Sequence, residues 1–376
     1  MKDNFYWYWI CNIKGLWTAG IKSLLDYFQS PKNVFDAEAD ELAHAIKYLR
    51  KPDKNLLENI LYSKDINRII REYSSLEERG IRFISQDDAL YPDKFKNIKD
   101  RPYSFYLKGN IHVYERLLNN PSVAIVGARE CTNYGLSMAK KIGFDLAAHG
   151  VNIISGMARG IDSSGLYGCI NAGGIGVGIL GCGVDVCYPR ENIELYEEIS
   201  RSGILMSEYP MGTPPNAWQF PLRNRMISAL ADIVLVVEAR KKSGSLITVE
   251  YANEQGKDVM AIPGRVSDKL SEGCNKVIRD GGGIVTCTKD ILEALYLVNY
   301  YKKDDCEEGS KDKKGNITLE KEIESLYSIV DLIPKSSSEI ARESGLSIEK
   351  VMAGLIKLQM MGYVEEPSKN QYMKKI

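Results

Sequence analysis

Residues 122–162 read SVAIVGARECTNYGLSMAKKIGFDLAAHGVNIISGMARGID, and this stretch decides the fold. Two short apolar runs, Val123–Val126 and Val151–Ile154, are separated by an amphipathic segment at Tyr134–His149. Continuous apolar strands that alternate with helices indicate a parallel sheet covered on both faces. A glycine closely follows each run, as expected where a strand turns sharply into a helix.

The same alternation continues to about residue 297. Further strands are expected at Gly176–Leu180, Ile204–Met206, Ile233–Val237, Val259–Ile262 and Ile284–Val285. Helices are expected between them at Ile193–Ser200, Asn224–Ala231 and Thr248–Gln255. We therefore predict an α/β fold, a Rossmann-like doubly wound and mostly parallel sheet, with its core at residues 122–297. Ligands of such sheets bind outside the carboxyl ends of the strands.

The 376 residues are enough for two or three domains. Apolar residues at helical spacing predict a helical domain at residues 1–78. The extended Rossmann-like domain then covers residues 79–298, and its lead-in is expected to be a docked linker with short strands such as Ser104–Lys108.

The C-terminal part divides into a linker and a small module. Residues 299–316 are almost all charged or small, which predicts a solvated linker. Residues 317–376 contain a helix, a turn with Gly345 and a second helix, Ile348–Met361. This order predicts a helix-turn-helix or winged-helix module.

Composition excludes several classes of protein. The net charge of −1 argues against a basic protein that coats nucleic acid with its whole surface. No apolar run reaches the roughly 18 residues of a membrane span, and Met1–Lys14 lacks the features of a signal peptide, so we expect a cytoplasmic protein. The eight cysteines have no two-residue spacing, and the three histidines lie far from paired cysteines, so no metal site is expected.

Cofactor and catalytic motifs are weak. Gly176–Gly181 fits G-x-G-x-x-G, but these glycines fall inside a predicted strand instead of opening a helix, so we expect no dinucleotide cofactor. A P-loop sequence is absent from the chain. None of the three histidines falls in the loops that follow the predicted strands, which makes a histidine-based triad improbable. Asp162 and Glu250 fall in first turns of predicted helices, where acidic residues stabilise the helix dipole.

Two loops at strand ends share one pattern, a glycine and an arginine before a helix. Gly127 and Arg129 follow the first strand; Ser155, Gly156 and Arg159 follow the second. Arginine presents a fork of donors suited to phosphate, and a helix N-terminus attracts anions. The alternative is that these glycines only form tight turns.

Two later segments add aromatic and cationic residues. The first, WQFPLRNR, places Phe220, Arg223, Asn224 and Arg225 at the start of a helix. The second, RKKSGS, places Lys241, Lys242, Ser243, Gly244 and Ser245 after the strand at residues 233–237. Single-stranded nucleic acid is bound by rings on which bases stack and by cations that neutralise phosphates. Buried aromatic residues and arginines in salt bridges are the structural alternative.

These loops, in this order, resemble the DprA/Smf family of DNA-processing proteins. The resemblance is carried by VAIVGARECTNYG, SGMARGID, AGGIGVGILGCGVDVCYP, GILMSEYP, FPLRNRMISAL, VVEARKKSGSLITVEYANEQGKDVMAIPG and EGCNKVIRDGG, which span about half of the chain. The N-terminal helices also resemble the family's SAM-like or helix-hairpin-helix-like domain, and the tail resembles its winged-helix domain.

The resemblance implies a protein that binds and protects single-stranded DNA in natural transformation, helps to load the RecA recombinase onto it, and acts as a homodimer without bond chemistry of its own. Its pocket would be formed by Gly127, Arg129, Ser155, Gly156, Arg159, Arg223, Asn224, Arg225, Ser243, Gly244 and Ser245; charge and position add Lys241 and Lys242. The sequence departs from the family pattern at two places. Where the family usually has a histidine, this chain has Gly165-Leu166. Where the family usually has a glycine-rich N-terminal turn, this chain has the segment Gly15–Gly20.

Two other functions compete with this one. Gly244-Ser245 and Thr248-Val249-Glu250 faintly resemble the pattern of phosphoribohydrolases, in which Glu250 would be the catalytic residue of a nucleotide-processing enzyme. A transcription regulator would use the C-terminal helix-turn-helix. Its second helix carries only Lys350 and Lys357 as cations, which suits a packing surface better than a reader of the major groove.

Overall fold

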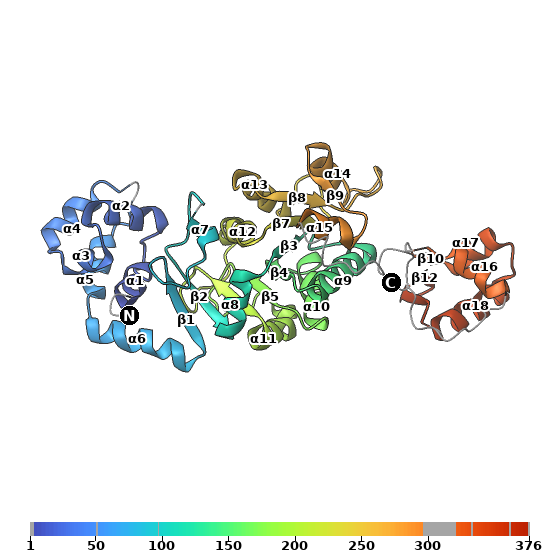
Figure 1. Cartoon of the computed structure of the whole chain (residues 1–376), viewed down its shortest axis with the longest axis horizontal. Helices are drawn as coiled ribbons and strands as arrows, with labels where there is room; N and C mark the ends of the chain where they lie inside the picture. The colour runs from blue at the N-terminus through green and yellow to red at the C-terminus, as the bar shows by residue number, and fades with distance from the viewer. Residues whose placement is uncertain are drawn as a thin grey trace.

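The structure is a computed structural model that describes residues 4–49, 52–96, 98–295, 321–331, 334–360 and 362–374. Its centre is a nine-stranded sheet of order β1-β2-β6-β5-β4-β3-β7-β8-β9 (Figure 1). These strands are β1 (Ile81–Ser85), β2 (Ser104–Gly109), β3 (Ser122–Val126), β4 (Asn152–Ser155), β5 (Gly176–Ile179), β6 (Ile204–Ser207), β7 (Ile233–Val236), β8 (Asp258–Ala261) and β9 (Gly283–Ile284). The predicted linker at residues 299–316 and the last residues of the predicted core lie outside the described residues.

Seven of the nine strands, from β6 to β9 in the sheet order, pair in parallel, and only β1 and β2 add antiparallel pairs at one edge. The prediction of a doubly wound, mostly parallel α/β sheet is therefore confirmed. The chain moves outward from β3 through β4 and β5 to β6, and then returns to place β7 on the other side of β3. The loops after β3 and β7 consequently meet at a topological switch point, where ligands of such sheets bind.

Strands β3 to β7 are buried on both faces, and alternate residues contribute to two separate cores. Val123 and Ile125 of β3 face one core, and Ala124 and Val126 face the other. The first core is covered by α9 (Asn133–Ala148), α10 (Ile161–Asn171), α11 (Ile193–Ser202) and α15 (Thr288–Ala294). The second is covered by α7 (Asp93–Lys96), α8 (Ile111–Asn119), α12 (Gln219–Leu230), α13 (Ser245–Glu254) and α14 (Glu272–Arg279).

Glycines allow α9 and α10 to pack with their backbones in contact. A methyl group at Gly143 of α9 would overlap the carbonyl group of Gly165 in α10, and one at Gly168 would overlap the carbonyl oxygen of Lys140. The two helices connect β3 to β4 and β4 to β5, so this packing fixes the start of α10 and the loop that precedes it. A Cβ at Gly165 itself would lie 3.0–3.2 Å from the Ile125 side chain of β3.

Gly143→Ala is expected to lower the free energy of unfolding by about 1–3 kcal/mol, because overpacking forces two backbones apart. Urea denaturation followed by circular dichroism measures this loss. Gly150→Ala is not a suitable control because Gly150 has a positive φ of 78°. Gly244→Ala is suitable, since a Cβ there meets no heavy atom within 4 Å. Equal stability of Gly143→Ala and the wild type would contradict the close packing.

The N-terminal part consists of α1 (Asn4–Cys11), α2 (Thr18–Phe28), α3 (Pro31–Asp36), α4 (Ala39–Ile46), α5 (Leu56–Ser63) and α6 (Ile66–Glu78). These helices lie beside the β1 edge of the sheet (Figure 1). The Trp7 indole donates to Asp87 over 2.7 Å, and the Tyr106 hydroxyl donates to Asn12 over 2.8 Å. Helix α1 therefore joins the helical part to β1 and β2, so the stretch expected to be a linker is an extension of the sheet.

The C-terminal part contains α16 (Lys321–Ile329), β10 (Lys335–Ser336), α17 (Ser337–Ser344), α18 (Ile348–Met360), β11 (Val364–Ser368) and β12 (Gln371–Lys374). The helices α17 and α18 are separated by Gly345, which ends α17 in the left-handed conformation (φ 69°). The strands form a separate antiparallel sheet of order β10-β12-β11, over a small core of its own. A winged-helix module stays our prediction for this part.

Two further expectations concern single motifs and membrane spans. Gly176 and Gly178 lie within β5, as predicted, so G-x-G-x-x-G here is a strand and not the start of a helix. In the part of the chain that the structure describes, no helix combines the length and apolar character that a membrane crossing requires.

Candidate nucleic-acid interface

Three loops are bonded together at the switch point. The amide of Ala128, after β3, donates to the carbonyl oxygen of Glu238, after β7, over 2.7 Å. The amide of Ile161, at the start of α10, donates to the carbonyl oxygen of Ala128 over 3.3 Å. Gly160 has a φ of 78°, and a side chain there would overlap the β3 loop. The glycines in these loops therefore allow the loop backbones to lie in direct contact with one another.

Glu238 organises the first loop although it is buried. Its carboxylate accepts from the amide of Thr132 over 2.8 Å and from the Thr132 hydroxyl over 2.5 Å. The Thr132 side chain in turn accepts from the amide of Gly135 and caps α9. The segment that carries Arg129 is thus held at both ends.

A pocket of about 680 Å³ opens between these loops and the start of α12. Five cationic side chains and only two carboxylates line it. The cations are Arg129, Arg159, Arg223, Arg240 and Lys242, and the acids are Glu130 and Asp162. Glu130 accepts from Arg240 at 3.5 Å on the exposed surface, so the remaining excess of positive charge faces the pocket. A local cationic pocket therefore exists in a chain whose net charge is −1.

Aromatic rings lie beside these cations. The Phe220 ring stacks on the Tyr188 ring with centroids 5.4 Å apart, and the Arg129 guanidinium lies 5.6 Å from the Phe220 centroid. Tyr188 is 40% exposed, which leaves ring surface available to a ligand. An exposed ring next to an exposed guanidinium is suited to a stacked base and its phosphate.

Arg223 is a positioning residue at the base of this pocket. The guanidinium donates to the carbonyl oxygens of Gly156 and Ile179, at the ends of β4 and β5. Burial lowers the pKa of Arg223 to about 10, and the nearby Asp162 opposes this shift, so the group stays protonated at neutral pH. Asp162 also accepts from the amides of Gly156 and Ala158. Because both groups are committed to backbone partners, they shape the pocket more than they bind a ligand.

The fourth loop brings the N-terminus of α13 to the pocket. Ser243 and Ser245 share a hydrogen bond of 2.8 Å, and Asn224 donates to the carbonyl oxygen of Gly244 over 3.3 Å. Gly244 is exposed, and a Cβ added to it would have no heavy atom within 4 Å. The two hydroxyls lie at the N-terminus of a helix, where the helix dipole favours an anion such as phosphate.

Ten of the fourteen predicted residues line this pocket: Gly127, Arg129, Arg159, Phe220, Arg223, Asn224, Lys242, Ser243, Gly244 and Ser245. Gly156 lines a small recess beside it, together with Arg129 and Phe220. Ser155 is fully buried and donates to the carbonyl oxygen of Ile125, and Lys241 lines a different pocket, so neither lines the pocket as expected.

For Arg225 the structure corrects the expectation that its side chain faces the pocket. Arg225 lies on the opposite side of α12 from the pocket residues and forms an ion pair of 2.5 Å with Glu208, in which the side chains are 7% and 14% exposed. It also donates to the carbonyl oxygen of Asp100 over 2.7 Å. The residue therefore joins α12 to the end of β6 and to the segment before β2. Its neighbour Arg223, two positions earlier, carries the contact with the pocket.

Sequence reasoning missed Tyr188 as a pocket residue, and it expected the cations of the RKK run to lie together. Tyr188 lies in the CYP motif after β5, and the rule that ligands bind at strand ends could have pointed to it. Arg240 begins the RKK run, whose Lys242 faces the pocket while Lys241 does not. A loop without regular structure offers no periodicity from which to tell these directions apart.

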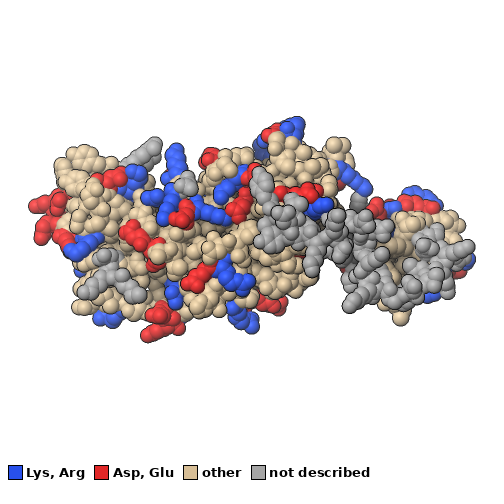
Figure 2. Space-filling model, in the orientation of Figure 1, with Lys and Arg blue, Asp and Glu red and all other residues tan. Residues whose placement is uncertain are grey.

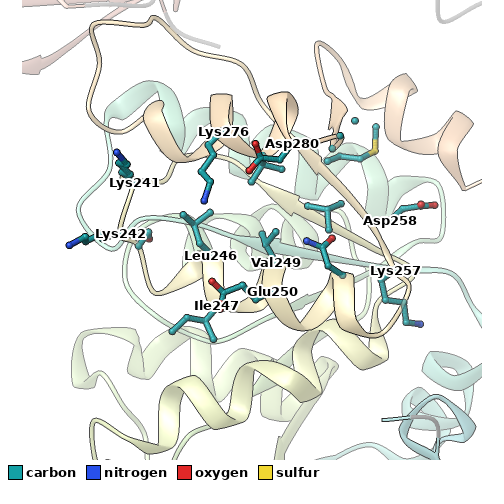
Figure 3. Close-up of a pocket in the computed structure, with 18 of the residues that line it drawn as sticks. Lys241, Lys242, Leu246, Ile247, Val249, Glu250, Lys257, Asp258, Lys276 and Asp280 are labelled. Carbon is teal, nitrogen blue, oxygen red and sulfur yellow. The ribbon is translucent and has the colours of Figure 1, made fainter. Parts of the chain in front are cut away.

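A second pocket, of about 770 Å³, lies between α13 and α14 (Figure 3). Leu246, Val249 and Glu250 of α13 face Lys276 of α14 and Asp280, directly after that helix, across it. Glu250, the candidate catalytic residue of the enzyme hypothesis, thus lies outside the pocket that Arg129 and Ser245 line. The two pockets adjoin, since Lys242, Ser243 and Ile247 line both.

Residues 82–296 match the family described as DNA recombination-mediator protein A. The chain belongs to this family. The "Protein Smf" of Escherichia coli is 32% identical over 292 residues, which are 77% of this chain and 76% of that protein. The "DNA processing protein DprA" of Streptococcus pneumoniae is 40% identical over 54% of this chain and 71% of that protein.

Solved structures of family members show the same fold. The X-ray structure of DNA processing protein A from Streptococcus pneumoniae aligns with a TM-score of 0.65 and 31% identity, over 77% of this chain and 97% of that chain. A structure of DNA processing protein A from Helicobacter pylori aligns with a TM-score of 0.52 and 27% identity, over 58% of this chain and 97% of that chain. That Helicobacter pylori protein is described as having a unique single-stranded DNA binding mode.

Proposed function

We propose that this family member binds single-stranded DNA in the pocket lined by Arg129, Phe220 and Ser243–Ser245. The observation that carries the proposal is the pairing of exposed Arg129 with the Phe220 and Tyr188 rings at the mouth of a cationic pocket. In the part of the chain that the structure describes, no ion pair holds Arg129, so it is available to a phosphate.

Binding to an oligothymidylate is expected to weaken linearly on a log–log salt plot. Each neutralised phosphate contributes about 0.7 to the slope on a single strand, so five cations set an upper bound of about 3.5. Fluorescence anisotropy of a labelled strand, with a duplex of equal length as control, measures this slope. Equal affinity for duplex and single strand, or a slope near zero, would contradict the proposal.

The finer parts of the proposal are protection of incoming single strands in natural transformation and loading of RecA recombinase onto them. The description of the family as a recombination mediator supports this role. RecA filament formation on single-stranded DNA, with and without the protein, tests it. No acceleration by the wild type would contradict the loading role, while leaving DNA binding intact.

We further propose a homodimer that acts in the cytoplasm without bond chemistry of its own. Support for a second copy comes from the sheet edge at β9, where Ile284 is 52% exposed. The free cysteines among the described residues suit a reducing compartment. The pocket carboxylates Glu130 and Asp162 already face Arg240 and backbone amides, which supports a binding role over a catalytic one.

A further inference from the structure

The N-terminal helices bring an exposed indole to the edge of the pocket region. Trp17 lies directly before α2 and is 61% exposed, and Trp218 lies directly before α12 and is 48% exposed. Their rings meet edge to face, with centroids 5.5 Å apart and an interplanar angle of 90°. Two segments separated by some 200 positions in the sequence therefore share one exposed aromatic contact.

This contact is not needed to hold the two parts together. Helix α1 joins the N-terminal helices to the sheet, because Trp7 stacks on Tyr103 and donates to Asp87. Trp7 is only 3% exposed, whereas Trp17 and Trp218 keep about half of their surface in water. A ring pair with a purely structural role is normally buried, because burial is what stabilises it. Trp218 also meets the Tyr209 ring edge to face at 6.2 Å, and the exposed part of each indole is the surface available to a base.

The pair continues the aromatic surface of the pocket. Trp218 is two residues before Phe220, which stacks on Tyr188, and Pro215 and Ala217 beside it line the pocket. The segment from Pro215 to Phe220 thus links the pocket to the Trp17–Trp218 pair. Successive rings on one surface are the arrangement on which bases of a single strand stack.

Cations accompany this surface at the seam between the two parts. Lys14, three residues before Trp17, is exposed and has no carboxylate partner among the described residues. Burial raises the pKa of Tyr103, and Lys22 of α2 and Arg101 before β2 oppose this shift, so both cations lie near that ring. Lys22 is paired with Asp26 at 2.6 Å. Figure 2 shows Lys and Arg side chains around α7, where Lys94 and Lys96 are paired with Asp232 and Asp93. A phosphate on a path over the seam would therefore meet mainly Lys14 and Arg101.

We propose that Trp218 and Trp17 extend the DNA-binding surface, so that a single strand leaving the pocket stacks its next bases on these two indoles. The ligand is a single strand of any sequence, because every base offers a face for stacking. The inference rests on the proposed function of the pocket. It assigns to the N-terminal helices a direct contact with DNA.

The test uses the full chain and two oligothymidylates, one of about 6 and one of about 20 nucleotides, since single-strand sites of this kind span about 4–16 nucleotides. Trp17→Leu is expected to weaken binding of the long strand by about 5- to 100-fold, the range for one stacked base, and to leave the short strand unaffected. Leucine keeps an apolar contact with Trp218 but offers no ring for stacking. Trp17→Phe should restore most of the affinity.

Tryptophan emission provides a second readout. The long strand should quench wild-type emission more than the short strand does, and Trp17→Phe should remove part of that difference, because Trp7 and Trp9 are buried and serve as a constant background. Tyr62→Ala, an exposed aromatic residue on α5, is the matched control and should bind both strands as the wild type does.

The outcomes separate the two proposals. If the wild type binds neither strand, the pocket assignment itself is wrong. If it binds both, and Trp17→Leu matches it for both lengths, the extension is wrong while the pocket stands. Equal losses in Trp17→Leu for the short and long strands would also overturn the extension, since they would indicate a general disturbance of the pocket.

Discussion

Arg225→Ala is expected to lower the free energy of unfolding by about 3–5 kcal/mol, because it leaves the Glu208 carboxylate buried without a partner. The ion pair measures 2.5 Å and both side chains are largely enclosed. Arg225 also donates to the carbonyl oxygen of Asp100, so the substitution removes a second bond between α12 and the segment before β2. Urea denaturation followed by circular dichroism gives the change directly.

Arg159→Ala is the matched control for that experiment. Arg159 also pairs with a glutamate, Glu191, but at 3.6 Å and with both side chains about 60% exposed. Exposed pairs contribute about 0–1 kcal/mol, so stability should hardly change. A small loss in Arg225→Ala, combined with weaker DNA binding, would return Arg225 to the DNA-contacting residues and contradict its structural role.

The double variant Arg129→Ala/Lys242→Ala is expected to weaken binding to an oligothymidylate by about 100-fold or more at low salt. Hydrogen bonds to charged groups contribute about 1.5–3 kcal/mol each, and 3 kcal/mol corresponds to roughly 100-fold. The salt slope should fall by about 1.4, which is the share of two phosphates on a single strand. Both side chains are exposed and line the pocket, so stability should stay within about 0.5 kcal/mol of the wild type.

Lys140→Ala/Lys141→Ala removes the same charge from the exposed surface of α9 and serves as the control. It should retain the affinity and the salt slope of the wild type. Similar losses in both double variants would mean that binding follows overall charge and not the pocket.

Much of the fold could be predicted because each strand of the parallel sheet is a continuous apolar run. Strand β3, expected at Val123–Val126, is found at Ser122–Val126, and β7, expected at Ile233–Val237, is found at Ile233–Val236. Strand β1 was not expected, because Ile81–Ser85 contains Arg82 at an exposed position and lies in a stretch with loop composition. Its partner β2, at Ser104–Gly109, was anticipated as a short strand in a linker, and pairing between the two depends on contacts distant in sequence.

The site was predictable where backbone geometry decides the residue type. Gly127 is required by a close contact between loops, and Ser243–Ser245 follow from a helix N-terminus at the end of a strand. The roles of Arg223 and Arg225 could not be separated in this way. Both arginines are buried in α12, and their directions depend on where Gly156 and Glu208, which lie 67 and 17 positions away, are placed by the fold.

Ultraviolet crosslinking of an oligothymidylate to the full chain, followed by mass spectrometry of the crosslinked peptides, tests the pocket most directly. We expect the main crosslinks to fall on the peptides that contain Phe220 and Tyr188, and we expect Arg129→Ala/Lys242→Ala to reduce them. Main crosslinks on α18, or on the groove between α13 and α14, with none at Phe220 or Tyr188, would contradict it.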